Sequence, residues 1–519
     1  MKAQTRSHDV IVIGTGMGGG TIGRRLAEAG LCVLFVERGP AGLRMEETEL
    51  NADIWDREAR LVRGFWPEPM TADVDGVETT FNAPLGAGIG GSSVFYAATL
   101  ERPEPHDLDH SEEMPHPTGG WPIGYTEMQP YFEEAEAQFF VRGTSDPLGQ
   151  PVDLLEPLDM PPADSALFEA MQKAGLHPYQ GHMALRDKDG CNSCLGRKCP
   201  RRCKMDGRSA GVEPALETGN ADVLDLTEVT RINTDRHGVT SITALRNGQE
   251  ITLTARAYVL AAGALASPRL FMASGIVGSS GLVGRNLMFH LNEMFALWPG
   301  RDHKGSGATK SLAFRDTYRS GDTRLGMVQA MGIEARYGEI VHFLNMAFDR
   351  SLLRKLRPLR QLTHIPAALA VRLFGDAKLF VGILEDLPYA ENRVLFDPDR
   401  PRHVRIKYSI APELRARRKT LRRAVRSSLK GLRTVFLGTG PDLNWGHPCG
   451  TLRFGNDPAT SVLDRDCRTH DVENLWVADA SFMPTSMGVN PSLTIAANAL
   501  RVGDAIIAEL GKEADNDQA

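Results

Sequence analysis

Three glycines near the amino terminus, Gly14, Gly16 and Gly19, have the spacing G-x-G-x-x-G. Glycines at these positions allow a tight turn and let the backbone approach a pyrophosphate group closely. Glu37 lies 23 residues after Gly14, where an acidic side chain can accept hydrogen bonds from a ribose diol. These residue types and their spacing predict a dinucleotide site. Glu37 favours a ribose without a 2′-phosphate, as in FAD or NAD.

Four of the seven cysteines, Cys191, Cys194, Cys199 and Cys203, lie within thirteen residues. Three interpretations are open. The thiolates could hold an iron–sulfur cluster, with five neighbouring Lys and Arg residues offsetting their charge, although the spacing matches neither common ferredoxin run. They could hold a tetrahedral zinc ion. They could also be free thiols or local disulfides within one loop.

The segments around the glycines have the pattern of a strand, a helix and a second strand. Residues 10–13 are a short β-branched run, typical of a buried parallel strand. A helical pattern follows and ends at Gly30, and a second apolar run, residues 31–36, leads directly to Glu37. The glycine turn therefore precedes a helix N-terminus, where unpaired N–H groups and the helix dipole attract phosphate.

Further glycine-rich turns and apolar runs follow in order along the chain. They are residues 86–93 (GAGIGGSS), 121–125 (WPIGY), 258–268 (YVLAAGALASP), 446–451 (GHPCGT), 475–479 (LWVAD) and 488–494 (GVNPSLT). The loop at 86–93 is too rich in glycine for an ordinary turn, and it indicates a backbone that passes close to a flat or anionic group. Residues 475–479 are another predicted buried strand, which ends on an acid.

These motifs, in this order, resemble those of the glucose–methanol–choline (GMC) family of FAD-dependent oxidoreductases. The resemblance covers nearly the whole chain and is weakest from residue 300 to residue 380. It implies an α/β fold, α+β overall, with a Rossmann-like FAD-binding domain and a substrate or cap domain whose antiparallel sheet is covered by helices. The FAD-binding domain would comprise residues 1–50, 80–105, 205–300 and 440–519. The substrate domain would comprise residues 106–204 and 301–439, including the Cys-rich loop 191–203.

The resemblance also implies which residues bind FAD. It assigns Gly14, Gly16 and Gly19 to the pyrophosphate, Glu37 to the adenosine ribose, Gly90, Gly91 and Ser92 to the loop beside the flavin, Val229 to the adenine, Asp479 and Ala480 to the ribityl–pyrophosphate region, and Asn490 and Pro491 to the isoalloxazine edge, with Arg38 and Ala262 as further cofactor-binding candidates. Some family members attach FAD covalently through a histidine just after the G-x-S-S segment. This chain has Val94, Phe95 and Tyr96 there, so we expect non-covalent FAD.

The catalytic residues are likewise implied by the resemblance. His447 matches the catalytic histidine of the family, the general base that takes the hydroxyl proton while a hydride leaves for flavin N5. A histidine suits this task because its usual pKa of about 6.5 lies near working pH. Asn490, 43 residues later, matches the partner position. Because an amide does not exchange protons at neutral pH, Asn490 would orient the alcohol. We interpret His290 as structural.

Composition and charge exclude several classes of protein. The chain has 519 residues, with 42% hydrophobic and 24% charged, which is typical of a globular protein and not of a disordered, fibrous or disulfide-dense one. No apolar run reaches the roughly 18 residues of a membrane-spanning helix. We see no secretory leader, so we expect a cytoplasmic location.

One basic stretch stands out against a net charge of −6. Residues 400–433 hold 13 Lys and Arg residues and one acid, Glu413. The apolar spacing predicts a helix over residues 413–437. Its basic face is interpreted as a solvated surface packed on an acidic body, or alternatively as a peripheral contact with an anionic partner or membrane. No interleaved aromatic residues support nucleic-acid binding.

The predicted function is FAD-dependent oxidation of an alcohol CH–OH to an aldehyde or ketone, with oxygen or a carrier as electron acceptor. The Cys-rich loop is similar to loops of sugar dehydrogenases, and the acidic remainder of the chain would favour a cationic substrate. We therefore expect a sugar or aminosugar hydroxyl, as in aminoglycoside-type antibiotic biosynthesis. A sterol or long-chain alcohol is the alternative substrate. A hydroxynitrile-lyase-like flavoprotein and a non-catalytic FAD-binding protein are alternatives of other classes.

Overall fold

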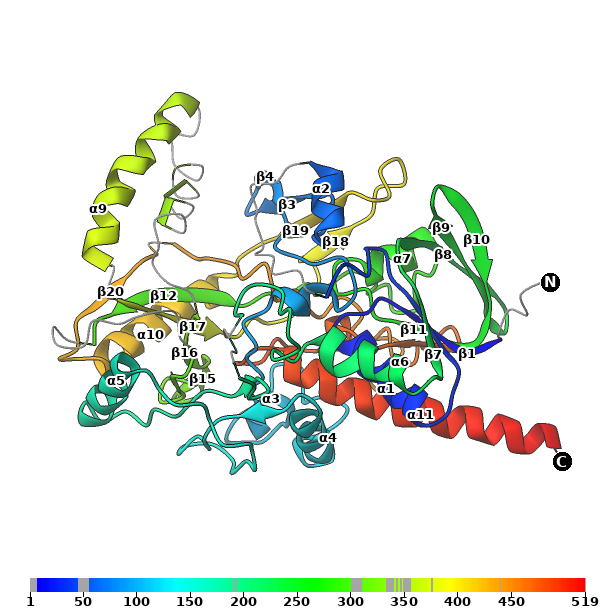
Figure 1. Ribbon diagram of the computed structural model, residues 1–519, viewed down its shortest axis with the longest axis horizontal. Helices are drawn as coiled ribbons and strands as arrows, with labels where there is room; N and C mark the ends of the chain where they lie inside the picture. The colour runs from blue at the N-terminus through cyan, green and yellow to red at the C-terminus, as the bar shows by residue number, and fades with distance from the viewer. Residues whose placement is uncertain are drawn as a thin grey trace.

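A parallel five-stranded sheet is assembled from segments spread over the whole chain (Figure 1). The computed structural model describes residues 7–44, 56–189, 191, 194–299, 310–332, 340–341, 344–345, 348, 356–374, 377–438 and 440–518. The strand order is β21 (Leu475–Val477), β11 (Ala255–Leu260), β1 (His8–Ile13), β2 (Val33–Val36) and β7 (Ala221–Leu224). All neighbouring strands run parallel. The β-branched run predicted as a buried strand is the central strand β1.

Two helices pack together beside this sheet. α1 (Met17–Glu28) follows β1 directly, and α11 (Ser492–Gln518) is the long carboxy-terminal helix that runs next to it in Figure 1. Ile22 and Leu26 of α1 are fully buried. The strand–helix–strand unit at the start of the chain and the sheet it joins confirm the predicted Rossmann-like fold.

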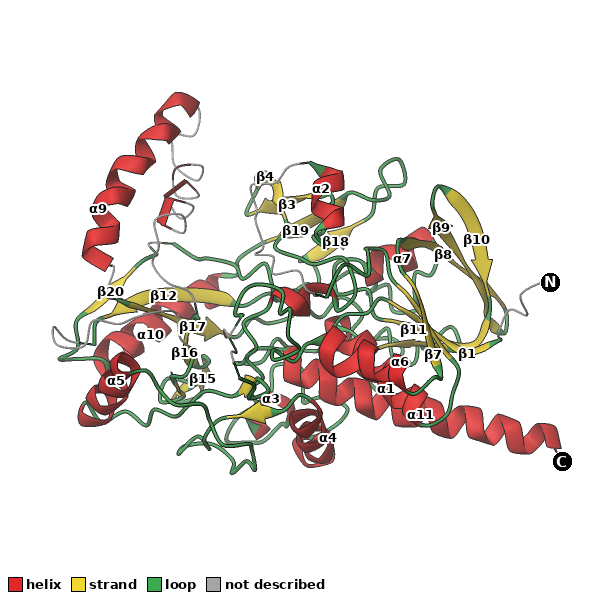
Figure 2. Cartoon of the chain, viewed as in Figure 1, coloured by secondary structure: helices red, strands yellow, loops and turns green. Residues whose placement is uncertain are grey.

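A second sheet is antiparallel, and it has five strands in the described part of the chain. Their order is β13 (Ala313–Phe314), β16 (Val328–Ala330), β17 (Lys378–Leu384), β12 (Leu291–Leu297) and β20 (Thr434–Phe436). Every residue of β17 is buried, because α10 (Pro412–Ser428) packs against β12 and β17. Figure 2 shows α10 and α5 (Pro162–Lys173) beside this sheet. The predicted domain boundary at residue 300 falls after β12, whose partners belong to the predicted second domain.

Smaller elements connect and flank these two sheets. A four-stranded sheet has the order β18 (Arg393–Leu395), β19 (Val404–Tyr408), β3 (Pro69–Val74) and β4 (Val77–Asn82), and a three-stranded sheet has the order β10 (Gln249–Leu253), β9 (Gly238–Arg246) and β8 (Thr227–Asp235). The chain also contains η1 (Gly91–Phe95), α3 (Pro105–Leu108), α7 (Ser267–Ala273), β14 (Arg319–Ser320), β15 (Thr323–Arg324), η4 (Arg357–Thr363), α9 (His364–Phe374) and η5 (Ala480–Phe482). Shorter pieces are α2 (Arg57–Val62), α4 (Tyr125–Gln138), β5 (Val141–Arg142), β6 (Met183–Ala184), η2 (Gly207–Val212) and α6 (Glu213–Glu217).

The prediction of a basic helix over residues 413–437 is wrong about where the helix ends. α10 ends at Ser428, and Gly431 turns the chain with a φ of +96°. Residues 434–436 then pair with β12, so edge-strand hydrogen bonding replaces the helical bonds that the apolar spacing predicted. Within the described residues, no helix is both long and apolar enough to cross a membrane.

The basic face of α10 is also less solvated than predicted. Arg418 is buried and lies 2.9 Å from Glu293 of β12. Arg417 is buried as well and lies 2.6 Å from Glu413. Part of the charge is therefore neutralised inside the protein, as expected for a basic helix that packs on an acidic body.

Candidate active site

A cavity of about 1580 Å³ extends along the parallel sheet and reaches the antiparallel one. It exceeds the roughly 300–1,000 Å³ of a typical small-molecule pocket, so it has room for a dinucleotide and a second molecule. We call the part lined by the first glycine turn, Glu37 and β8 the dinucleotide end. We call the part lined by residues of β12, β16, β17 and the turn around His447 the catalytic end.

The glycine turn forms one wall of the dinucleotide end. Gly14 has a φ of +98°, and a Cβ there would lie 2.4 Å from the carbonyl oxygen of Ala261, so only glycine fits. Gly16 is the N-cap of α1, and no atom lies within 4 Å of the position that its Cβ would take. The open space beside Gly16, at the N-terminus of a helix, is suited to a pyrophosphate group.

Glu37 is buried and is held by backbone donors. Its Oε2 accepts hydrogen bonds from the Thr15 amide at 3.1 Å and from the Thr15 hydroxyl at 2.5 Å, and its Oε1 accepts from the Gly39 amide at 3.0 Å. Burial raises the pKa of Glu37, and these hydrogen bonds oppose that shift. A carboxylate fixed in this way beside the cavity can accept from a ribose diol.

The structure places most of the predicted cofactor residues on the cavity wall. Gly14, Gly16, Glu37, Arg38, Gly91, Ser92, Val229, Ala262, Asp479, Ala480, Asn490 and Pro491 line it. Gly19 and Gly90 do not, because each packs against the protein: a Cβ would lie 2.1 Å from Gly14 O at Gly19 and 2.5 Å from Val94 at Gly90. These two glycines allow close packing of the loops that form the wall.

Two charged residues of the predicted set are already engaged with protein groups. Arg38 lies 2.6 Å from Glu68 and 4.6 Å above the ring of Trp66. Asp479 accepts from the Gly263 amide at 2.8 Å and from the Ser267 hydroxyl at 2.5 Å. Both side chains therefore also shape the wall.

At the catalytic end, the histidine pair His290 and His447 fixes a tautomer. Burial lowers the pKa of His290 to about 4, so its ring is neutral and carries one proton. His290 Nε2 lies 3.0 Å from the carbonyl oxygen of Met487, which can only accept, so the proton is on Nε2. His290 Nδ1 is therefore an acceptor, and it lies 3.1 Å from Nδ1 of His447. His447 must donate from Nδ1, which leaves the lone pair on its Nε2.

Asn444 makes a second contact with His447. Its amide nitrogen lies 3.2 Å from His447 Nδ1, which by itself would favour the opposite tautomer. The Gly446 amide donates to Asn444 Oδ1 at 3.2 Å, which supports this orientation of the Asn444 amide. We assign the tautomer from the His290 contact, because it is the shorter of the two, at 3.1 Å, and because a carbonyl fixes the proton of His290. With the opposite tautomer, two unprotonated Nδ1 atoms would face each other at 3.1 Å.

The pKa of His447 favours the neutral ring. Protein surrounds the ring, although part of its surface is reachable from the cavity. Burial, followed by the proximity of the basic groups His290 and Lys310, lowers its pKa well below the usual value. At pH 7 the side chain is therefore an unprotonated imidazole that can accept a proton at Nε2.

Polar groups without protein partners also line the catalytic end. The side-chain oxygens of Asn490 and of Asn292, in β12, are buried and accept no hydrogen bond from the described residues. Buried polar atoms are normally paired, so two such atoms on one cavity wall indicate a ligand that donates hydrogen bonds. Asn490 lies just before α11, and Ile495 N–H donates to Pro491 O in the first turn of that helix.

Lys310 is a buried cation on the same wall. Its side chain is 8% exposed, and Nζ donates to the hydroxyl of Thr99 at 2.8 Å. Burial lowers the pKa of Lys310 to about 8, against an opposing effect of Glu101. The amide of Gln329, in β16, and the apolar side chains of Met331, Val381 and Ile383 complete this wall.

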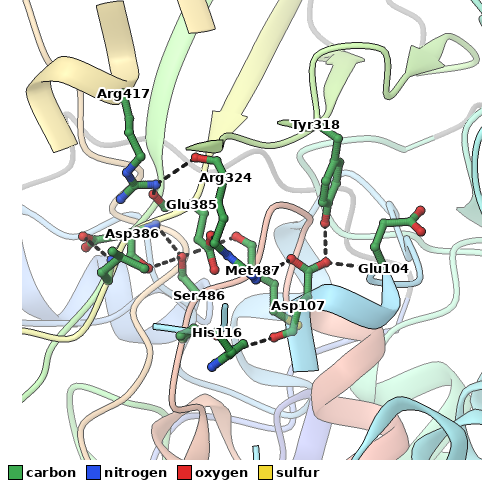
Figure 3. Close-up of polar contacts among 12 residues, drawn as sticks. Glu104, Asp107, His116, Tyr318, Arg324, Glu385, Asp386, Arg417, Ser486 and Met487 are labelled. Carbon is green, nitrogen blue, oxygen red and sulfur yellow. Dashed lines mark hydrogen bonds and ion pairs between the residues drawn. The ribbon is translucent and has the colours of Figure 1, made fainter. Parts of the chain in front are cut away.

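Asp386 bonds both to the segment that carries His290 and to Ser486, which precedes Met487; Figure 3 shows Asp386, Ser486 and Met487 together. The carboxylate of Asp386 accepts from the Phe289 amide at 3.0 Å, so it fixes the residue before His290. The Asp386 amide donates to Ser486 Oγ at 2.7 Å, next to the Met487 carbonyl that accepts from His290. The orientation of His290 thus depends on the end of β17.

A buried ionic network extends from this point (Figure 3). Arg324 lies 2.8 Å from Glu385 and 3.4 Å from Asp107, and the Tyr318 hydroxyl donates to Asp107 at 2.5 Å. Arg417 of α10 donates to the Glu385 carbonyl at 2.8 Å. Segments from α3, β15, β17 and α10 therefore support the histidine pair together.

Profile matches to a known family cover more than half of the chain. Residues 8–292 match the amino-terminal part of GMC oxidoreductases, and residues 388–499 match the carboxy-terminal part. The chain belongs to the GMC oxidoreductase family. This confirms the predicted family, and family membership supports FAD as the cofactor.

Named relatives agree with this assignment. Paromamine 6′-oxidase of Streptomyces fradiae is 29% identical over an alignment that covers 97% of this chain and 92% of the relative. The 2-methyl-1,2-propanediol dehydrogenase of Mycolicibacterium austroafricanum is 27% identical, covering 98% of this chain and 96% of the relative. The crystal structure of pyridoxine 4-oxidase from Mesorbium loti has the same fold, with a TM-score of 0.64 at 20% identity over 96% of this chain and 99% of that one.

Sequence reasoning missed several residues of the catalytic end of this GMC protein. Asn444 lies three residues before His447 in the same turn, and that spacing was a usable signal. The position of Asn292, two residues after His290, was a weaker signal in the sequence. Lys310 and Gln329 belong to the segment with the weakest family resemblance, and no local pattern marks them.

The four clustered cysteines pack against one another, and no disulfide joins them. Cys194, Cys199 and Cys203 are buried, and Cys191 is partly buried. Among the residues that the structure describes, no group of three or more His, Cys, Asp or Glu side chains is arranged to hold a metal ion.

Proposed function

We propose that this GMC oxidoreductase oxidises an alcohol CH–OH to a carbonyl, with His447 as the general base. The observation that carries the proposal is the His290–His447 contact, which leaves His447 neutral with its lone pair on Nε2. A base of this kind takes the hydroxyl proton as the carbon gives up its hydride. The rate contribution of such a base is typically about 10²–10⁴-fold.

We propose that FAD binds non-covalently along the cavity. The open space at Gly16 would hold the pyrophosphate, Glu37 the adenosine ribose and Val229 the adenine. When bound, FAD supplies flavin N5 as the hydride acceptor. Val94, Phe95 and Tyr96, which follow the G-x-S-S segment, offer no histidine for covalent attachment.

The two unpaired amide oxygens would position the substrate. Asn490 cannot act as a base, but its Nδ2–H can donate to the alcohol oxygen, whose own proton is directed at His447 Nε2. The Oδ1 atoms of Asn490 and Asn292 can accept hydrogen bonds from further hydroxyls of the substrate. Holding the reacting carbon in one orientation increases the rate of the chemical step, because the reacting groups then meet in a productive geometry.

The catalytic end favours a polyhydroxylated substrate over a sterol. Asn292, Lys310, Gln329 and Thr99 bring donors and acceptors to one wall. A sterol would leave the side-chain oxygens of Asn292 and Asn490 unpaired, which costs about 1–3 kcal/mol for each buried group. The relative that acts on paromamine supports the finer proposal of an aminosugar hydroxyl.

Lys310 limits where an amino group of such a substrate can lie. Lys310 is the cation that acts on His447, so the catalytic end does not attract a second cation, whatever the charge of the rest of the protein. An aminosugar would therefore bind with its ammonium group away from Lys310 and with a hydroxyl next to it.

Anaerobic stopped-flow mixing of the flavoprotein with a panel of alcohols tests the proposal. We expect bleaching of the oxidised flavin absorbance with sugars or aminosugars and slower or no bleaching with sterols and long-chain alcohols. Bleaching by sterols alone would overturn the substrate class. A flavin that stays oxidised with every alcohol, together with release of cyanide from a cyanohydrin, would indicate the hydroxynitrile-lyase alternative. Repeating turnover with oxygen and with dichlorophenolindophenol identifies the electron acceptor.

For the Cys-rich loop, we propose that the N–H groups around Cys199 favour its deprotonated form, while an iron–sulfur cluster, a zinc ion and plain thiols all stay open as interpretations. Its sulfur accepts from the Cys203 amide at 3.3 Å and from the Lys204 amide at 3.4 Å. Burial opposes the charged form, but these N–H donors outweigh it and lower the pKa of Cys199. Assays of iron and acid-labile sulfide on anaerobically purified protein distinguish a cluster from plain thiols, and a zinc assay distinguishes the third interpretation.

A further inference from the structure

η4 and α9 extend away from the two main sheets (Figures 1 and 2). Five large apolar side chains on this segment are between 39% and 70% exposed: Leu356, Leu359, Leu362, Ile365 and Leu369. Their spacing is three residues through the 3₁₀ turns of η4 and four residues in α9. Residues three apart eclipse in a 3₁₀-helix, and residues four apart share a face in an α-helix, so the five form one stripe.

The same segment is basic. Residues 356–374 contain Arg357, Arg360 and Arg372 and neither Asp nor Glu. An exposed apolar stripe together with basic residues alone is the pattern of a helix that lies in the interface of an anionic lipid membrane.

The base of α9 joins a second basic and apolar surface. The ring of Phe374, at the end of α9, lies 5.5 Å from that of Trp298, and the guanidinium of Arg433 lies 4.0 Å from the Trp298 ring. Next to Arg433, Val435 of β20 and Leu437 are each 40% exposed. α9, β20 and α10 thus lie at the same end of the molecule in Figure 1.

We propose that the α9 surface, formed by residues 356–374 with residues 433–437, docks on an anionic phospholipid membrane. Its apolar stripe would enter the boundary between headgroups and acyl chains, and the positive charge of the segment would favour an anionic lipid surface. Pairing of two α9 surfaces from different copies would place like charges opposite one another, so a second copy is a poorer occupant.

This surface adjoins the catalytic end of the cavity. Met331 lines the cavity and packs on the cluster of Ala296, Ala377 and Leu379, which also contacts Trp298 and Phe374. Docking would therefore hold the substrate side of the protein near the lipid. The proposal goes beyond alcohol oxidation and does not depend on its substrate.

Vesicle sedimentation with the full-length flavoprotein tests the proposal. We expect sedimentation with vesicles that contain phosphatidylglycerol and not with pure phosphatidylcholine, and we expect added salt to weaken it. The double variant Ile365→Asp/Leu369→Asp should lower binding at least about 10-fold. Val277→Asp, at a side chain that is 67% exposed elsewhere, is the matched control and should bind like the wild type.

Three outcomes would overturn the membrane proposal. The first is a wild-type protein that binds neither type of vesicle, and the second is undiminished binding by the double variant. In the third outcome, the wild type binds no vesicles but forms a concentration-dependent dimer, seen by light scattering, and the double variant stays monomeric. This result would assign the stripe to contact with a second copy. Bound flavin absorbance and anaerobic flavin reduction of the double variant should match the wild type, which separates this test from the test of alcohol oxidation.

Discussion

The two ends of the cavity are built in different ways. At the dinucleotide end, Glu37, its partners Thr15 and Gly39 and the glycine turn all lie within the first 39 residues. At the catalytic end, His447 contacts His290 across 157 residues of sequence, and Lys310 contacts Thr99 across 211. The glycine turn and Glu37 are a local structure, to which β8 adds a wall from a later segment, whereas the catalytic end exists only when distant segments meet.

The difference determines how each end responds to mutation. Backbone geometry and a few hydrogen bonds define the dinucleotide end, so a change there should alter cofactor affinity and little else. A network of side chains from α3, β15, β17 and α10 supports the catalytic end, so changes well away from His447 should alter its chemistry (Figure 3).

The largest expected effect comes from a substitution that removes the base at the catalytic end and leaves the dinucleotide end unchanged. His447→Ala removes the proposed base and should slow anaerobic flavin reduction about 10²-fold or more, while FAD stays bound. His403 lines the same cavity but lies by β3, with its ring 3.0 Å from the Thr71 hydroxyl. His403→Ala is the matched control and should reduce flavin at the wild-type rate; equal losses in both variants would contradict the assignment.

The next effect is confined to the dinucleotide end. Glu37→Gln replaces a buried charged acceptor and should weaken FAD binding about 10- to 100-fold, since hydrogen bonds to charged groups contribute about 1.5–3 kcal/mol. Titration of the apoprotein with FAD, followed by fluorescence, measures the change. Once saturated with FAD, the variant should reduce flavin at the wild-type rate. A large loss of that rate would show that the two ends are coupled.

Substitution of His290 tests whether it positions His447. His290→Leu removes the acceptor for His447 Nδ1–H and should lower the flavin reduction rate about 10-fold, as part of the contribution of a general base. The loss should appear in kcat more than in KM, with a changed pH profile. His290→Asn, whose amide oxygen can accept the same proton, should restore part of the rate. If both variants keep the pH profile of the wild type, His290 only packs against His447 and does not set its protonation.

The smallest effect concerns substrate choice. Lys310 is protonated below its pKa of about 8 and neutral above it, so its repulsion of an ammonium group is present at pH 7 and fades as the pH rises through 8. Lys310→Met should lower the KM for an aminosugar several-fold at pH 7, by about 1 kcal/mol or less, and raise that for its neutral hydroxyl analogue. The difference from the wild type should shrink at pH 9. KM values that move together for both substrates would contradict this role.

Local patterns in the sequence determined the first part of the fold and one end of the site. The β-branched run, the glycine turn and Glu37 predicted β1, α1 and the dinucleotide end, because their contacts lie between residues close in the chain. The motif order predicted the family and placed His447 and Asn490 as candidates. The same local reasoning extended the basic helix to residue 437, since apolar spacing does not show that residues 434–436 pair with β12.

Tertiary structure alone decided the rest. Nothing near Gly19 or Gly90 in the chain shows that they pack against protein, whereas Gly16 opens into the cavity. The proton on His447 Nδ1 follows from a carbonyl at Met487 that holds His290, and the buried cation at Lys310 comes from a segment without a motif. Spacing encodes contacts made within one turn or one strand pair. Burial, tautomer and charge at a site depend on every segment that the fold brings to it.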